Sequence, residues 1–312
     1  MNKPAIIVIT GPTATGKTAL GASLAKIQNG EVVSADSMQI YTHMDIGTAK
    51  PSSEERLGVP HHMIDIVPPW EDYSVARYVS DAALCIDDIR DRNRLPVIVG
   101  GTGLYIDSLL SGGGFSAHCD ESLRRELEDE YDHIGGEAML LRLNEFDRDS
   151  ATKLHANDKK RIVRAFEVFR TAGKPISQHD LETKAIPPRY KAVKIALTFS
   201  DRAELYSRID RRVEKMLSSG LEREVRSLID MGVIPGATSM QAIGYKEMVD
   251  VISGGLTLDE AAAKIKMESR RYAKRQLTWL RRDAGVKWII WEKTPDIEGC
   301  VRELSEFINE AQ

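Results

Sequence analysis

The feature that most constrains the fold is a glycine-containing loop near the N-terminus, between a short apolar run and a helical segment. Residues 5–9 are apolar and are predicted to form a buried strand, and residues 19–25 are predicted to be helical. The loop fits the pattern G-x-x-x-x-G-K-[ST] and consists of Gly11, Pro12, Thr13, Ala14, Thr15, Gly16, Lys17 and Thr18. In this context the pattern predicts a phosphate-binding loop, because backbone N–H groups and a helix N-terminus converge on an anion. Lys17 adds a positive charge and the Thr18 hydroxyl is a ligand for Mg²⁺, so we expect a bound pyrophosphate or polyphosphate.

The first hundred residues alternate apolar runs with helical patterns, which is typical of a parallel sheet covered by helices. Further strands are predicted at 31–36, 61–67 and 95–101, and helices at 75–92 and 102–110. We therefore expect an α/β fold whose core is a parallel sheet like that of P-loop nucleoside triphosphatases.

The alternation stops at three glycines, 112–114, and the following residues to about 185 are charged and helical without a convincing strand. Later strands are predicted at 193–199 and 286–291. The chain is therefore expected to contain the first part of the core at 1–114, a helical insertion domain at 115–185, and the completion of the core with a largely helical C-terminal region at 186–312.

Capping signals mark two long helices of the C-terminal region. Asp201 is predicted to open a helix that ends near Ser218. Thr257 and Glu260 form a capping box that is predicted to open another helix, which ends near Asp283.

The composition bounds the class of protein. A hydrophobic content of 42% and a charged content of 29% are ordinary for a soluble globular chain. Cys85, Cys119 and Cys300 are far apart and form no C-x-x-C pair, so they indicate neither a disulfide framework nor a zinc site and favour a reducing compartment. The first strand begins too early for a targeting peptide, and no apolar run could cross a bilayer. We expect a cytoplasmic monomer with no membrane association, and the net charge of −4 still allows a local basic face for nucleic acid.

Two polar residues are predicted at strand ends, where ligands of α/β sheets bind. Asp36 ends the strand at 31–36 and could be a general base, or it could cap the next turn. Thr102 follows the strand at 95–101, where a nucleotide-hydrolysing P-loop protein usually carries a metal-binding acid. From the local sequence, a helix N-cap is the favoured role for Thr102.

Arg208 and Arg212 lie four residues apart and are predicted to share one helix face. Arginine suits phosphate oxygens, but the local sequence favours a solvated face on which these residues pair with Glu204 or Asp210.

Two further stretches, 159–164 and 270–282, are rich in lysine and arginine. The second interleaves Tyr272 and Trp279 with the cations, which suits a nucleic acid because rings can stack on bases. A solvated helix face is the slightly favoured alternative, and the two rings could equally belong to the core.

Taken in order, these and other motifs resemble those of the bacterial tRNA dimethylallyltransferases, or isopentenyl transferases, nearly end to end. The segments that carry the resemblance are 11–18, 34–41, 44–51, 59–65, 99–105, 155–158, 242–246 and 274–281. The resemblance implies a P-loop core with a helical insertion domain. It also implies Mg²⁺-assisted transfer of a dimethylallyl group from dimethylallyl diphosphate to N6 of the adenosine directly 3′ of the tRNA anticodon.

The resemblance also implies roles for single residues. Asp36 matches the family's proposed base and Thr102 matches a threonine at its reaction centre. Lys17, Arg212 and Thr18, the last through Mg²⁺, would stabilise the diphosphate, so the resemblance reverses the local preferences for Thr102 and Arg212. Contacts with the anticodon stem-loop are implied for Asp36, Ser37, Met38, Gln39, Thr102, Arg124, Lys160, Arg161, Arg164, Met240, Gln241, Gly244, Tyr245, Lys274, Arg275 and Arg281.

Three alternatives remain at this point. An adenylate isopentenyltransferase, which prenylates free AMP, ADP or ATP, shares the core and the acid, but the basic helix at 270–282 and the full-length C-terminal region argue against it. A P-loop small-molecule kinase is disfavoured because no acid follows the strand at 95–101. A non-enzymatic RNA-binding protein is disfavoured because Asp36, Thr102 and Arg212 occur together.

Overall fold

The structure, a computed structural model, describes residues 5–111 and 121–311. The chain divides into two compact units, one formed by Met1–Leu110 with Tyr190–Gln312 and the other by Ser111–Arg189. The domain boundaries near 114 and 185 stay a prediction, and the first of them, like Cys119, lies outside the described residues.

Six strands of the first unit form one sheet in the order β3-β2-β4-β1-β5-β6, and every neighbouring pair is parallel. The strands are β1 (Ala5–Thr10), β2 (Gly30–Ser34), β3 (His61–His62), β4 (Leu95–Val99), β5 (Lys191–Phe199) and β6 (Lys287–Trp291). The predicted α/β fold with a parallel sheet is confirmed. Since all strands point the same way, the loops at their carboxyl ends gather at one edge of the sheet, where ligands bind in such folds.

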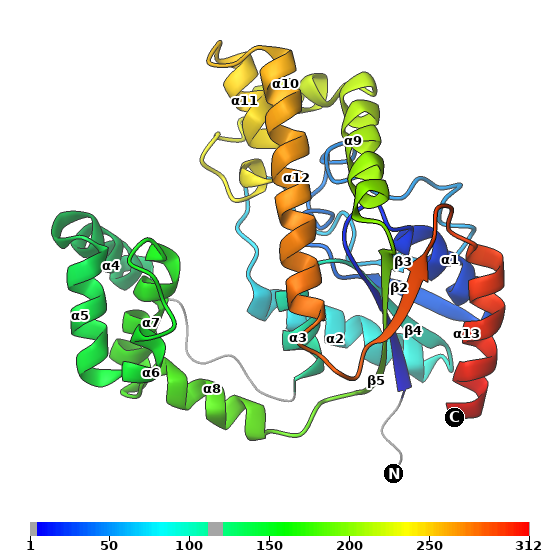
Figure 1. The fold of residues 1–312 in the computed structure, drawn as a ribbon, viewed down its shortest axis with the longest axis horizontal. Coiled ribbons are helices and arrows are strands. Elements are labelled where there is room, and N and C mark those ends of the chain that lie inside the picture. Colours follow the sequence, from blue (N-terminus) through cyan, green and yellow to red (C-terminus); the bar gives the residue numbers. More distant parts are fainter. Residues whose placement is uncertain (1–4, 112–120, 312) are drawn as a thin grey trace. The chain divides into compact units, whose positions relative to one another are not determined.

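Both faces of the sheet are covered, which is why its strands read as continuous apolar runs. Ile6 and Val8 of β1 pack into one core cluster, and Ile7 and Ile9 pack into a second cluster on the opposite face. The first cluster includes side chains of α2 (Val75–Asp91) and α3 (Gly103–Leu110). The second includes side chains of α1 (Lys17–Ile27) and α13 (Ile297–Ala311), which lie together in Figure 1.

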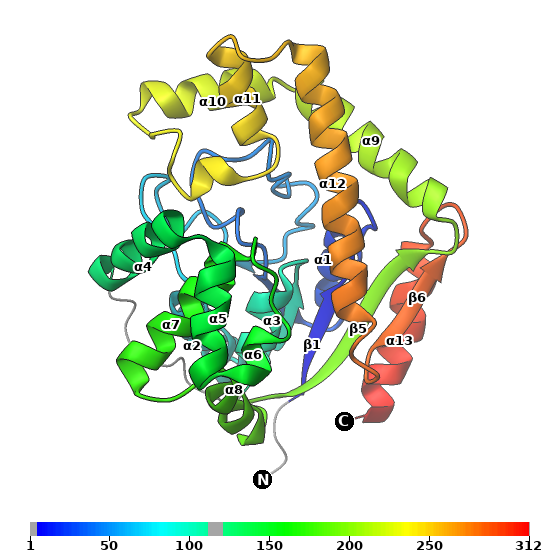
Figure 2. The ribbon, with the colours of Figure 1, turned by 60° about the vertical axis from the view of Figure 1, so that its left-hand side comes forward.

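The remaining helices of the first unit follow β5. They are α9 (Arg202–Ser218), α10 (Leu221–Asp230), α11 (Tyr245–Ile252) and α12 (Leu258–Leu280), with a short 3₁₀ turn at Ser239–Gln241. Helices α9 and α12 lie side by side (Figures 1 and 2) and are joined by an ion pair between Asp210 and Arg270. Across residues 5–111 and 121–311, every helix is too short or too polar to span a membrane.

The second unit is helical over its described residues. It contains α4 (Glu121–Ile134), α5 (Gly136–Phe146), α6 (Arg148–Ala151), α7 (Lys159–Ala172) and α8 (Ile176–Ala185). Leu127, Leu143, Ile162 and Phe166 belong to a core cluster of its own. The unit therefore has an independent hydrophobic core.

The predicted caps of the two long helices are confirmed. The Asp201 carboxylate accepts a hydrogen bond from the N–H of Ala203, and Thr257 and Glu260 form the reciprocal capping box. Helix α12 ends three residues before Asp283, because the Asp283 carboxylate bonds Lys194 and the N–H of Gly285 and closes the following turn.

The predicted strand at 61–67 is wrong beyond His62. Met63 and Asp65 adopt left-handed backbone angles, with φ of 62° and 57°, so the chain turns away from the sheet. Val67 forms only an isolated bridge with Tyr41. Met63 and Val67 are buried in the first core cluster, so the apolar pattern of this segment reflects burial rather than a strand.

A substitution at Gly100 tests how closely the chain after β4 approaches the chain after β2. A Cβ atom at this position would lie 2.1 Å from the backbone oxygen of Ala35, so Gly100→Ala must displace the backbone beside the cavity described below. Overpacking of this kind costs about 1–3 kcal/mol, and we expect the thermal unfolding midpoint to fall by several degrees. Gly236→Ala is the matched control, since nothing lies within 4 Å of its Cβ position. Equal midpoints for the two variants, measured by circular dichroism, would contradict the close approach.

Candidate active site

The phosphate-binding loop connects β1 to α1 and depends on its two glycines. Gly11 has a φ of 140°, and a Cβ there would lie 2.4 Å from the backbone oxygen of Leu197. Gly16 is the N-cap of α1 with a φ of 91°, and no side chain caps the helix. The first N–H groups of α1 are therefore available to an anion.

A cavity of about 460 Å³ opens beside this loop. Its walls come from the loop itself, the segment after β2, the turn at 47–49, the end of β4, residues 238–243, and helices α9 and α12. Of the predicted site residues, it brings together Thr13, Lys17, Thr18, Asp36, Ser37, Met38, Gln39, Arg212, Gln241 and Arg275. Residues that are far apart in the sequence thus meet at the carboxyl end of the sheet.

Lys17 and Arg212 place two cations in this cavity. Lys17 donates a 2.7 Å hydrogen bond to the backbone oxygen of Pro12. Burial and, to a smaller extent, the charge of Arg212 lower the pKa of Lys17 to about 7, although the charge of Asp36 opposes the shift. Burial also lowers the pKa of Arg212. Both cations are thus poorly solvated, and an anion between them would stabilise both.

The surface pairing that the local sequence favours for Arg212 is wrong. Glu204 instead pairs with Arg211, and Asp210 pairs with Arg270 of α12. Arg212 turns toward the cavity, where its Nη2 donates a 3.4 Å hydrogen bond to the backbone oxygen of Thr48.

Asp36 lines the cavity, whereas Thr102 bonds the two residues that flank Asp36 in the chain, Ala35 and Ser37. The Asp36 Oδ1 atom accepts hydrogen bonds from the N–H groups of Met38 at 2.9 Å and Gln39 at 3.4 Å, so the predicted turn cap is present. The same carboxylate lines the cavity, so capping and chemistry are compatible. The Thr102 hydroxyl accepts a 3.1 Å hydrogen bond from the N–H of Ser37, which ties the end of β4 to the turn that carries Asp36.

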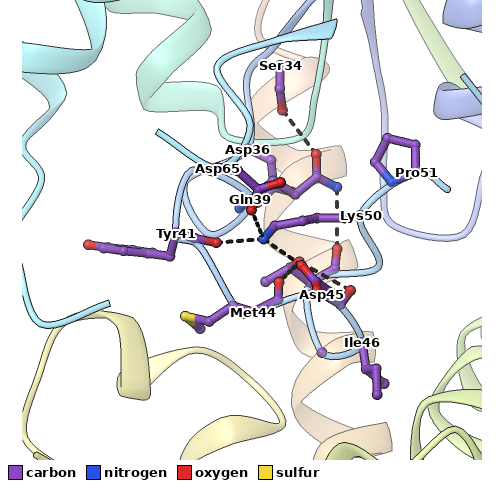
Figure 3. Close-up of polar contacts among 12 residues, drawn as sticks. Ser34, Asp36, Gln39, Tyr41, Met44, Asp45, Ile46, Lys50, Pro51 and Asp65 are labelled. Atoms are coloured by element: carbon purple, nitrogen blue, oxygen red, sulfur yellow. Dashed lines mark hydrogen bonds and ion pairs between the residues drawn. The ribbon is translucent and has the colours of Figure 1, made fainter. Parts of the chain in front are cut away.

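The loop between β2 and β3 is built on Gln39, as Figure 3 shows. The Gln39 side-chain oxygen accepts a 3.1 Å hydrogen bond from the Ser34 hydroxyl. Its amide nitrogen donates to the backbone oxygens of Thr48 at 3.4 Å and Ala49 at 3.3 Å. These hydrogen bonds from Gln39 therefore fix the backbone of Thr48 and Ala49, two residues that line the cavity.

Lys50 holds the far end of the same loop (Figure 3). Its side chain is only 5% exposed, and Nζ donates to the backbone oxygen of Tyr41 at 2.6 Å. Nζ also pairs with the carboxylates of Asp45 at 2.7 Å and Asp65 at 2.5 Å. A buried amine with three such partners fixes the path of the loop rather than offering a charge to a ligand.

Gln276 of α12 is a cavity residue that the sequence analysis did not assign, and Tyr272, for which base stacking and the core were the alternatives, lines the same cavity. The Gln276 amide donates to the backbone oxygen of Gly101 at 2.9 Å and accepts from the N–H of Thr13 at 3.2 Å, so it bridges the phosphate loop and the β4 turn. Burial and the charge of Asp36 raise the pKa of Tyr272 to about 12, although hydrogen bonds with Thr102 and Gln276 lower it. Gln276 lies within the 274–281 motif, and its place in that motif is the sequence signal that could have identified it as a site residue.

The remaining predicted RNA-binding residues of the first unit occupy different environments. Met240 and Tyr245 are fully buried, so their side chains have no surface to offer to RNA. Gly244 is the N-cap of α11. Lys274, in the C-terminal half of α12, and Arg281, the C-cap residue of that helix, are exposed. Their contacts with RNA stay predictions.

In the second unit, two of the four predicted cations are part of an ion cluster. Arg124 and Arg164 both pair with the carboxylate of Glu167, whose side chain is 1% exposed. Lys160 and Arg161 are exposed at the start of α7. The cluster stabilises the unit, and a role for these four cations in RNA binding stays a prediction.

A metal ion at this site would need oxygen atoms from a bound phosphate as well as from the protein. Among the residues that the structure describes, no three histidine, cysteine, aspartate or glutamate side chains are grouped to hold one. Thr18 lines the cavity and two further cavities of about 400 and 700 Å³. Mg²⁺ commonly combines few protein oxygens with phosphate oxygens, and this donor set fits that mode.

Comparisons with known proteins agree with this geometry. Residues 39–283 match the family model described as IPP transferase, and residues 4–65 match one described as Isopentenyl transferase. The chain belongs to the IPP transferase family. The proteins named tRNA dimethylallyltransferase from Acetivibrio thermocellus and Carboxydothermus hydrogenoformans are 45% and 49% identical to it, over 97% and 91% of both chains. The family predicted from the motifs is confirmed.

Solved structures of this family share the fold. The full-length tRNA isopentenylpyrophosphate transferase of Bacillus halodurans is 42% identical, with a TM-score of 0.74 over 99% of this chain and 96% of that chain. A eukaryotic dimethylallyltransferase acting on tRNA is 28% identical, with a TM-score of 0.82 over 98% of this chain and 80% of that chain.

The lowered pKa of Lys17 predicts a pH-dependent anion site. Because this pKa is about 7, Lys17 is mostly charged at pH 6 and mostly neutral at pH 9 in the free protein. Raising the pH should therefore weaken the binding of inorganic pyrophosphate. In Lys17→Arg the charge persists at every pH tested, so its affinity should follow only the ionisation of the pyrophosphate itself. Calorimetric titrations from pH 6 to 9 test this, and parallel pH profiles for the two proteins would contradict it.

Proposed function

We propose that the chain transfers a dimethylallyl group from dimethylallyl diphosphate to N6 of the adenosine 3′-adjacent to the anticodon of tRNA. The observation that carries this proposal is the single cavity in which Asp36 lies with Lys17 and Arg212. The Asp36 carboxylate can accept a proton, and the cations of Lys17 and Arg212 can hold a leaving diphosphate. Two relatives of more than 40% identity carry the name tRNA dimethylallyltransferase, which supports the same activity.

The diphosphate is held by the phosphate-binding loop. Lys17, Thr18 and Arg212 line the same cavity, and no side chain caps the N-terminus of α1. Arginine binds two oxygens of a phosphate at once, and this geometry would orient the donor. The Thr18 hydroxyl and the diphosphate oxygens would hold Mg²⁺, which supplies additional neutralisation of phosphate charge.

The transfer step forms a bond between adenine N6 and the allylic carbon and breaks the bond between that carbon and the diphosphate oxygen. The N6 lone pair is delocalised into the ring, so the amine is a weak nucleophile, and a base must accept one of its protons as the new bond forms. Asp36 accepts this proton as general base, and Thr102, bonded to the neighbouring Ser37, lies at the same turn. The electron pair of the broken bond leaves on the diphosphate, where Lys17 and Arg212 stabilise the new charge.

The adenosine must leave its stack to reach the cavity, as bases do in other enzymes that modify them. A cavity of about 460 Å³ lies in the range of small-molecule sites. The exposed cations Lys274 and Arg281 of α12 would then contact the phosphates of the anticodon stem-loop. We further propose that the protein works as a monomer in the cytoplasm.

A direct assay separates this proposal from its alternatives. The protein is incubated with Mg²⁺, labelled dimethylallyl diphosphate and either unmodified tRNA or AMP. Label in tRNA, mapped by nuclease digestion to the adenosine beside the anticodon, is the expected result. Label in AMP alone would assign the chain to the adenylate class instead. Transfer to neither acceptor would overturn the proposal.

Replacing the proposed base gives the first mutational prediction. Asp36→Asn removes the proton acceptor but keeps the oxygen that caps the turn, so kcat for transfer to tRNA should fall about 10²-fold or more. Binding of tRNA, measured by filter retention, should change little. Asp91→Asn on the exposed end of α2 is the matched control and should retain full activity. An unchanged rate for Asp36→Asn would remove this residue from the chemistry.

The RNA-binding role of α12 predicts a change in salt dependence. The double variant Lys274→Gln, Arg281→Gln should bind tRNA more weakly, and the slope of log affinity against log salt should decrease by roughly one per lost phosphate contact. Lys26→Gln with Lys293→Gln removes the same charge from exposed sites on other elements and serves as the control. If the two double variants bind tRNA equally at low and moderate salt, α12 is only a solvated face.

A further inference from the structure

Glu224 of α10 makes four hydrogen bonds that reach the edge of the cavity, although none of the sequence motifs includes it. Its Oε2 atom accepts from the N–H groups of Asp45 at 2.9 Å and Ile46 at 2.8 Å. Its Oε1 atom accepts from the N–H of Gly47 at 3.1 Å and from the hydroxyl of Tyr245 at 2.6 Å. Three consecutive N–H groups thus converge on one carboxylate, in the manner of a backbone nest around an anion.

The segment that Glu224 holds is part of the cavity wall. Gly47, Thr48 and Ala49 line the cavity, and the backbone oxygen of Thr48 accepts the hydrogen bond from Arg212. Because the three N–H groups before it are fixed, this carbonyl keeps one direction. The carboxylate on α10 therefore acts on the guanidinium of α9 through the backbone of the loop.

Tyr245 completes this clamp from α11. A Cβ atom at Gly47 would lie 2.3 Å from the Tyr245 ring, so only glycine fits where the loop crosses the ring. Burial and the nearby charge of Glu224 raise the pKa of Tyr245 well above its usual value, so its hydroxyl remains a donor. Two motifs that are distant in the sequence, 44–51 and 242–246, meet at Glu224.

We infer that Glu224 is a positioning residue for the diphosphate, and that it acts by fixing the 45–49 loop so that the Thr48 carbonyl directs Arg212 into the cavity. This inference rests on the proposed function, since it assigns Arg212 to the diphosphate half of the reaction. Because Glu224 would act on the diphosphate and not on the RNA, its loss should change the KM for dimethylallyl diphosphate and not the KM for tRNA.

The test is Glu224→Gln, which replaces one acceptor oxygen by an NH₂ group that faces donors. Hydrogen bonds to a charged carboxylate contribute enough that their loss should change binding about tenfold. We expect the KM for dimethylallyl diphosphate to rise about tenfold and the affinity for inorganic pyrophosphate to fall by a similar factor, with the KM for tRNA unchanged. Glu222→Gln, on the same helix and paired only with Arg226 in the described contacts, is the control and should behave as the wild type.

A double-mutant cycle distinguishes positioning from general support of the fold. If Glu224 acts through Arg212, Glu224→Gln should change pyrophosphate affinity less than about twofold when Arg212 is already alanine. Additive losses would overturn the inference. Tyr245→Phe removes one of the four donors and should shift pyrophosphate affinity in the same direction by a smaller factor, which keeps the test valid if Glu224→Gln unfolds.

Pyrophosphate binding also separates this inference from the proposed function. Wild-type protein that binds pyrophosphate but prenylates no tRNA would refute the proposed function, while the comparison with Glu224→Gln would still decide the inference. Equal pyrophosphate affinity of the wild type and Glu224→Gln would overturn the inference alone. Wild-type protein that does not bind pyrophosphate would overturn both.

Discussion

The architecture of the site depends on two cations, Lys17 and Arg212, that share a partly buried cavity. Taking charges out of water is costly unless partners compensate, and the free protein supplies only partial compensation. The carbonyl of Pro12 accepts from Lys17, the carbonyl of Thr48 accepts from Arg212, and Asp36 adds a negative charge that raises the pKa of Lys17. The two cations still outnumber this one acid, so the cavity is electrostatically complementary to a strongly charged anion.

Two like charges repel each other, so the loops that hold Lys17 and Arg212 in place must be rigid. The structure achieves this with long polar side chains that bond backbone groups, since a buried side chain can reach two loops at once. Gln276 joins the phosphate loop to the β4 turn, and Gln39 supports the backbone oxygens of Thr48 and Ala49. Lys50 and Glu224 then fix the remaining parts of the loop after β2. Most of these bonds join a side chain to the backbone, and Lys50 adds ion pairs with the carboxylates of Asp45 and Asp65.

Local patterns predicted most of the sheet, the phosphate loop and the caps of α9 and α12, because these features depend on neighbours in sequence. The strand expected at 61–67 was wrong beyond His62, since the backbone turns at Met63 while the apolar side chains of Met63 and Val67 still join the core cluster that contains Tyr41. The direction of Arg212 could not be read from its helix alone, because Asp210 pairs with a residue of α12. Glu224 had no local signal at all, since its partners lie in two other segments of the chain.

The lowered pKa of Lys17 connects this architecture to the proposed chemistry. In the free protein Lys17 is only partly charged near pH 7, which reduces the repulsion between the two cations. A diphosphate between them favours the protonated lysine, so full charge develops when the ligand provides its counter-charge. The departing diphosphate carries more negative charge than the allylic ester from which it forms. In the proposed reaction, the two cations would therefore stabilise the transition state, in which this charge develops, more than the ground state, and this difference would lower the barrier of the transfer step.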